Sequence, residues 1–296
     1  MEASGRKRTG LPQISGVWFN RGARVRRGET DIAINMTDVF YEDVKKDPKL
    51  RLYTPTSPVT WLVYMAAQWD PKSPWSDPRV RKAASLAIDR EMLIKLHAPG
   101  SNPIGSLGLQ GDPLAKHFPA DPYDPERAKR LLAEAGYPKG FHGGPCYPYE
   151  GQLWPMGEMV ANYWKAVGIT VDTVLLDRPA WSANRGGGKM KGATFTDPLY
   201  PPTIGGRLSY LFGTTSYGNY PDIQALWDRY SKAIDPEVRK DLIADIQRLI
   251  HERTMFIPLR SGVTPTAVGP RVKGNPFKIQ PLLWWSCPFE DMELVQ

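Results

Sequence analysis

Two segments that each open with an Asp-Pro pair constrain the fold of this chain more than any other feature. One runs from Asp77 to Glu91 and the other from Asp124 to Pro138. An N-cap aspartate accepts backbone N–H bonds that the first helical turn leaves open, and proline suits the next position because its missing N–H is not needed there. Small apolar residues then recur at helical spacing in both segments: Val80, Ala84, Ala87 and Ile88 in the first, and Ala128, Leu131, Leu132 and Ala135 in the second. The sequence therefore predicts two amphipathic helices, the second ended by a left-handed Gly136.

The rest of the chain alternates between strand patterns and helix patterns. Runs typical of strands occupy residues 17–19, 30–35, 50–53, 60–65, 169–176, 193–196 and 256–259. Runs typical of helices occupy residues 38–46, 153–167, 178–184, 221–232 and 236–252, with Val238 expected on the inward face of the last helix. A Gly-, Pro- and Ser-rich stretch at 98–122 predicts a long loop that is either functional or packed over another part of the fold. The alternation predicts an α/β fold.

Charge and hydropathy exclude two broad classes of function. The net charge is +7, but residues 1–27 carry +6 of it, which leaves the remaining 269 residues nearly neutral. A local basic start differs from the basic stripe that follows a nucleic-acid backbone, so we do not predict nucleic-acid binding. No apolar run approaches the ~20 residues that span a bilayer. The charged N-terminus lacks an apolar stretch and a cleavage site, so no signal peptide is expected in this chain.

The sequence offers no pattern that predicts catalysis, a metal or a cofactor. The histidines are scattered, without the spacing of metal ligands: they are His97, His117, His142 and His251. The stretch Gly186–Gly192 lacks the phosphate-loop pattern and predicts a surface turn. Cys146 and Cys287 either pair in an oxidising compartment or remain separate thiols, and their wide separation favours separate thiols. We therefore expect a protein that is not an enzyme.

Asp197 is the residue whose position in the sequence makes it a candidate for binding a cationic group. It follows the predicted strand 193–196 in a stretch that continues through Tyr200 to Pro202. A carboxylate held at a strand end beside aromatic rings can fix a cation, because burial strengthens a charged hydrogen bond. The alternative is an Asp-Pro pair that simply forms a turn, and the residues alone favour that alternative.

The order and the amino-acid sequence of several motifs resemble those of one known family. The motifs are Gly28–Ala33, Asp77–Glu91, Asp124–Pro138, Val167–Val171 and Ile246–Leu259. Together they are similar to the family 5 extracellular solute-binding proteins of ABC transporters, the dipeptide- and oligopeptide-binding proteins. A set of motifs that occurs in the same order as in the family is more specific evidence than any single motif.

The resemblance implies a fold, a function and a site. The implied fold is α/β and periplasmic-binding-protein-like (type II, two lobes), with a peptide or similar small solute bound in the cleft between lobes and passed to a membrane permease. It implies that Asp197 holds the ammonium group of the ligand, and we expect Phe195, Tyr200 and Trp181 to contact the ligand beside it. The sequence from Leu199 to Pro202 departs from the family's usual sequence, so the possibility that the ligand is not a peptide stays open.

The resemblance also predicts how the chain is divided and where it works. We expect residues 1–60 to form part of the first lobe and the crossover, 61–259 the complete second lobe, and 260–296 a return to the first lobe. Family members are longer, so we expect an N-terminally truncated chain in the periplasm or cell envelope, peripheral to the membrane through a permease. The alternative is a truncated, non-transport protein that acts as a chaperone-like or interaction module through Trp284 and Trp285.

Overall fold

The computed structural model describes residues 14–15, 21–34, 38–54, 56–109, 111–148, 153–186, 189–196, 203–212, 220–275 and 292–295. The chain divides into two units, each described here by itself. The first unit comprises Met1–Ser57, Ala98–Gly100 and Gly262–Gln296, and the second comprises Pro58–His97 and Ser101–Ser261.

The first unit is built on a four-stranded sheet that joins the two ends of the chain. Its strand order is β1 (Ile14–Ser15), β2 (Ile32–Ala33), β9 (Thr266–Val268) and β3 (Arg51–Tyr53). Ala33 and Ala267 pack with residues from α1 (Arg21–Arg26) and α2 (Asp38–Lys46), whereas Ile32 and Val268 belong to a separate cluster. This alternation places the two helices against one face of the sheet.

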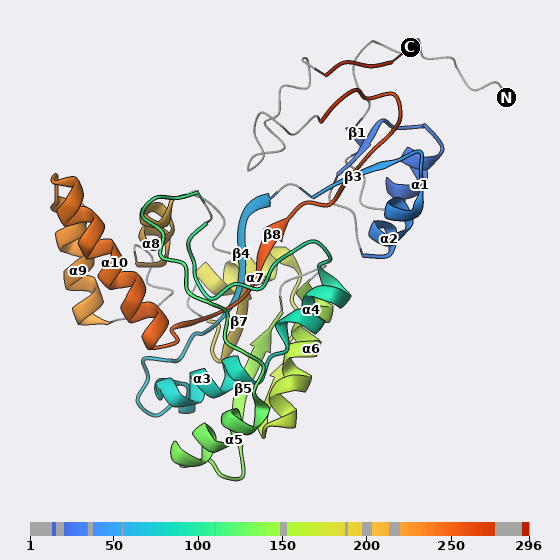
Figure 1. Cartoon of the computed structure of the whole chain (residues 1–296). Helices are drawn as coiled ribbons and strands as arrows, with labels where there is room; N and C mark the ends of the chain where they lie inside the picture. Colours follow the sequence, from blue (N-terminus) through green and yellow to red (C-terminus); the bar gives the residue numbers. More distant parts are fainter. Residues whose placement is uncertain are drawn as a thin grey trace. The chain divides into compact units, whose positions relative to one another are not determined.

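The second unit contains a five-stranded sheet that the chain enters and leaves along neighbouring strands. The strand order is β6 (Ile169–Thr173), β5 (Phe141–Tyr147), β7 (Ala193–Thr196), β4 (Thr56–Met65) and β8 (Phe256–Val263). Strand β4 leads in from the first unit and β8 leads back, and the two run side by side (Figure 1). Strand β5 is parallel to β6 and β7, whereas β4 is antiparallel to β7.

Helices cover both faces of this sheet. Val63 and Met65 of β4 pack with α3 (Pro78–Leu86), α4 (Arg90–His97), α5 (Pro125–Glu134) and α6 (Leu153–Ala166). Leu62 and Tyr64 pack with α8 (Ile204–Phe212), α9 (Pro221–Lys232) and α10 (Pro236–Glu252). A further helix, α7 (Arg178–Gly186), precedes β7. The α/β prediction is confirmed, and among the described helices none has both the length and the apolar character that crossing a bilayer requires.

The caps predicted for the two Asp-Pro helices are confirmed. Asp77 Oδ1 accepts the backbone N–H of Arg79 at 2.8 Å, and Asp124 Oδ1 accepts that of Arg127 at 2.9 Å. Gly136 has a φ of +94°, the left-handed conformation that ends α5. The two helices pack against each other with Ala84 and Ala128 fully buried, so the small residues permit a close approach.

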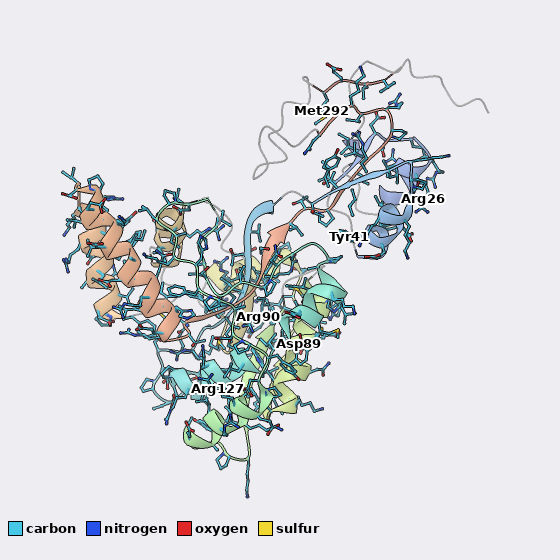
Figure 2. All side chains as sticks on the ribbon, in the orientation of Figure 1. Arg26, Tyr41, Asp89, Arg90, Arg127 and Met292 are labelled. Atoms are coloured by element: carbon cyan, nitrogen blue, oxygen red, sulfur yellow. The ribbon has the colours of Figure 1, made fainter. Side chains whose placement is uncertain are left out.

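The prediction of one helix across residues 77–91 is wrong. Helix α3 ends at Leu86, and α4 begins at Arg90. Asp89 starts the second helix, because its Oδ1 accepts the N–H of Met92 at 2.9 Å. The buried Arg90 donates to the carbonyls of Ser85 and Pro258, which fixes the bend (Figure 2).

Other differences come from residues that carry weak local signals. Helix α1, strand β5 and helix α8 were not predicted from the sequence, and the last two contain adjacent glycines. Gly143 of β5 lies against Trp75, where a Cβ would meet the indole at 2.6 Å, and its carbonyl accepts the indole N–H. Val238 is 45% exposed rather than inward, and β6 ends at Thr173 rather than at residue 176. The predicted strand 17–19 lies outside the described residues.

The long loop is packed over the second unit, as predicted. Its Phe118 ring stacks on His251 of α10 with ring centroids 4.1 Å apart. At the end of the loop, the Asp121 carboxylate accepts hydrogen bonds from Lys82 and Ser85 of α3. The loop therefore bridges helices that lie on opposite faces of the sheet.

We expect Asp121→Asn to lower the free energy of unfolding by about 1.5–3 kcal/mol at pH 7, the range for hydrogen bonds to charged groups. Burial raises the pKa of Asp121, but the hydrogen bonds from Lys82 and Ser85 outweigh it and leave the pKa below its ordinary value. The stabilisation is therefore present above the unfolded-state pKa and is lost as pH falls through the folded-state pKa.

Urea unfolding at pH 7 and in steps below about pH 4 measures this difference. The exposed Asp228→Asn on α9 is the control, expected within about 0.5 kcal/mol of the parent protein. Equal effects of the two substitutions at pH 7 would contradict the role of Asp121.

Candidate functional site

Of the residues predicted to bind ligand, Phe195 lies on strand β7. This strand is buried along its whole length, and it pairs with β4 so that Thr196 lies opposite Leu62. Phe195 is 1% exposed and belongs to the same core cluster as Val63, its partner in β4. Phe195 thus holds the strand in the core, and its contact with a ligand stays a prediction.

Trp181 lies on α7, the helix that precedes β7. The helix starts at Asp177, whose Oδ1 accepts the N–H of Ala180 at 2.8 Å. The Trp181 ring is buried, and the Arg185 guanidinium lies 5.3 Å from the centre of the ring. Its proposed contact with a ligand also stays a prediction.

Asp197 and Tyr200 lie outside the described residues, as do Trp284 and Trp285. The described segment 189–196 ends at Thr196, one residue before the aspartate. Strand β7 is antiparallel to β4, so its last residue lies beside the part of β4 where the chain enters the second unit. We name this part of the sheet the crossover end, defined by Thr60, Trp61 and Leu62 of β4, Thr196 of β7 and Arg260 of β8.

A buried guanidinium from α8 supports the crossover end on one face. Arg207 is fully buried, and its Nη1 donates to Thr60 Oγ1 and to the Leu107 carbonyl, both at 2.9 Å. The helix that carries it is capped from the long loop, because the Asp112 carboxylate accepts the N–H of Ile204. Arg207 therefore joins α8, β4 and the loop through one side chain.

A second buried guanidinium supports β8. Arg260 is 3% exposed and lies 5.4 Å from the centre of the half-buried Trp61 ring. Its Nη1 donates to Ser101 Oγ at 3.1 Å. The Ser261 N–H donates to the Asn102 carbonyl, and the Asn102 N–H donates to Ser261 Oγ. These contacts fix the strand where the chain leaves the second unit.

Sequence reasoning did not single out Arg207 or Arg260. A signal for Arg207 was present, since it stands between Ile204 and Leu208 on the buried stripe of α8. A charged residue within an apolar stripe indicates a buried, hydrogen-bonded cation, because an unpaired buried charge is costly. Arg260 follows the apolar strand residues 256–259 directly, which is a weaker form of the same signal.

The described residues offer little for other kinds of chemistry. In the segments that the structure covers, no group of three or more His, Cys, Asp or Glu side chains is placed to hold a metal ion. Cys146 is buried, and burial raises the pKa of its thiol to about 12, which suppresses the reactive thiolate. A cavity of about 30 Å³ under the long loop, beside Arg90 and Gln247, is too small for a solute.

Because Arg207 is buried and hydrogen-bonded, replacing it tests how the crossover end is held together. We expect Arg207→Met to lower the free energy of unfolding by at least about 2 kcal/mol, because it leaves Thr60 Oγ1 and the Leu107 carbonyl without their charged donor. Arg229→Met on the exposed surface of α9 is the matched control, expected within about 0.5 kcal/mol of the parent. Guanidinium unfolding measures both, and equal losses would contradict this role of Arg207.

Comparison with known proteins agrees with the fold. The model of the family described as bacterial extracellular solute-binding proteins, family 5 Middle, matches residues 19–208. The chain is 26% identical to heme-binding protein A of Haemophilus influenzae over 283 residues, which are 86% of this chain and 48% of that protein. It is 24% identical to the glutathione-binding protein GsiB of Escherichia coli K12, over 96% of this chain and 59% of that protein.

A solved structure gives the same result. The ABC transporter-associated periplasmic binding protein DppA of Helicobacter pylori, in complex with peptide STSA, superposes with a TM-score of 0.75 at 19% identity. The match covers 94% of this chain and 55% of that one. The expected periplasmic-binding-protein-like fold is therefore confirmed, and the chain spans about half the length of the relatives that it matches.

Proposed function

The chain belongs to the bacterial extracellular solute-binding proteins of family 5, and from this premise we propose that it binds a peptide or similar small solute for delivery to an ABC transporter permease. Binding without chemical conversion is the role, because the relatives are named for the solutes that they bind. The protein works in the periplasm or cell envelope and reaches the membrane through the permease.

The observation that carries this proposal is the register of β7 against β4. Thr196 stands opposite Leu62 at the crossover end, and Asp197 is the next residue in the sequence. Two buried arginines fix the neighbouring strands there, which gives the site a rigid base. A carboxylate carried on such a base is suited to the ammonium group of a peptide.

The proposal assigns the two parts of the chain to lobes. Residues 61–259 form the second ligand-binding lobe, and residues 1–60 and 260–296 belong to the first. Ligand contacts in the second lobe come from Asp197, with Phe195, Tyr200 and Trp181 beside it. The named ligands of the relatives, heme and glutathione, differ widely, so the fold alone does not select a peptide.

We expect the protein, purified without denaturation, to carry a small solute that native mass spectrometry detects. Calorimetry with the peptide Ser-Thr-Ser-Ala and with glutathione then measures affinity directly. Failure to bind either probe, together with an empty protein in mass spectrometry, would contradict the transport role.

Asp197→Asn tests the site itself. We expect it to weaken binding of a probe with a free ammonium group at least about tenfold, since one charged hydrogen bond is worth more than the 1.4 kcal/mol that this factor represents. The same peptide with an acetylated N-terminus should bind the parent and the variant equally. Asp245→Asn, on the exposed surface of α10, is the matched control. Unchanged affinity in Asp197→Asn would remove Asp197 from the site.

A further inference from the structure

An open concavity of about 420 Å³ lies on the second unit, at the opposite end of β4 from the crossover end. The segment that follows Met65 and the start of α3 form one side, and the ends of α9 and α10 form the other. Its lining residues are Gln68, Trp69, Pro71, Ser76, Pro78, Arg81, Tyr220 and Arg253. The volume falls in the range of small-molecule sites.

Arg81 supplies buried positive charge at this concavity. Its side chain is 2% exposed, and its Nε and Nη1 donate to backbone carbonyls, as does one N–H of Nη2. In the described part of the chain, the second N–H of Nη2 donates to no acceptor, and no carboxylate lies within ion-pair distance of the guanidinium. Burial lowers the pKa of Arg81, and it outweighs the opposite effects of Tyr220 and the Asp77 carboxylate.

The other charged side chain that lines the concavity, Arg253, is already paired. Arg253 donates from Nη1 and Nη2 to the Asp222 carboxylate, and Asp77 pairs with Arg79. Asp70 does not line the concavity, and its Oδ1 accepts the N–H of Lys72. Among the charged side chains that line the concavity, Arg81 is therefore the one without a carboxylate within ion-pair distance in the described part of the chain, and an anion in the concavity would meet Arg81 and the Arg253 side of that pair.

The remaining walls favour a flat apolar body. Tyr220 donates its hydroxyl to Gln68 Oε1, and the Arg253 guanidinium lies 5.5 Å from the centre of its ring. The side-chain Nε2 of Gln68 donates hydrogen bonds to the Met65 and Met255 carbonyls, so its amide is held in place. Trp69 and two prolines complete the wall with rigid apolar surface.

From these features we propose that this concavity is a second binding site, for a small carboxylate with an apolar or aromatic body. The carboxylate meets the free N–H of Arg81 and the guanidinium of Arg253, and the ring lies against Trp69. Fixed guanidinium groups favour planar, two-oxygen anions, which matches a carboxylate. Binding at this concavity does not depend on the transport role.

Benzoate is the probe, and benzamide is its uncharged counterpart of the same shape. We expect benzoate to produce saturable shifts of the amide NMR signals of residues 68–69 and 253–254, and to bind at least about tenfold more tightly than benzamide. Arg253→Gln and Trp69→Ala should each weaken benzoate at least about fivefold. The substitution at 253 keeps the backbone carbonyl that accepts the hydrogen bond from Arg81.

Arg248→Gln is the matched control, because Arg248 is an exposed arginine of α10 that also pairs with carboxylates. It should leave benzoate affinity unchanged. The titration is repeated in Asp197→Asn, where unchanged benzoate binding separates this site from the proposed transport site. Equal binding of benzoate and benzamide, shifts elsewhere on the protein, or equal effects of Arg253→Gln and Arg248→Gln would overturn the proposal.

Discussion

The second unit depends on one side chain, the guanidinium of Arg81. It donates to the carbonyls of Trp75 and Ser76, just before α3, and to those of Arg253 and Thr254, just after α10. Helices α3 and α10 lie on opposite faces of the sheet, so these bonds tie the two helical layers together beyond the end of β4. A lysine could not replace this pattern, because it lacks the planar fork.

The hydrogen bonds of Arg81 to the carbonyls of Arg253 and Thr254 also position the start of β8. Strand β8 starts at Phe256, two residues after Thr254, and ends beside the crossover end. Gln68 strengthens the same junction, since its amide donates to the carbonyls of Met65 and Met255. Arg260 and Arg207 then hold the other end of the sheet through Ser101 and Thr60. Buried, hydrogen-bonded side chains thus fix the central strands at both ends, while apolar clusters fill the two faces.

Sequence reasoning succeeded where local chemistry decides structure. The caps at Asp77 and Asp124 and the stop at Gly136 depend on neighbouring residues, and all three are present. It failed at Asp89, where a buried Arg90 that reaches Pro258 turns one predicted helix into two. It also missed β5, because the place of Gly143 is set by a contact with Trp75 that lies far away in sequence. Long-range contacts of this kind leave no local pattern.

The candidate site was less predictable for the same physical reason. The segment around Arg81 that resembles the family specifies how the layers are joined, because Arg81 donates to the carbonyls of Ser76 and Arg253. The residues proposed to contact the ligand, Asp197 and Tyr200, follow β7 in the sequence, and the side chains of that strand are themselves buried. Relatives named for heme and for glutathione match over most of this chain, so one scaffold serves different ligands. A residue that identifies the family therefore tells what holds the sheet, and it does not by itself tell what is bound.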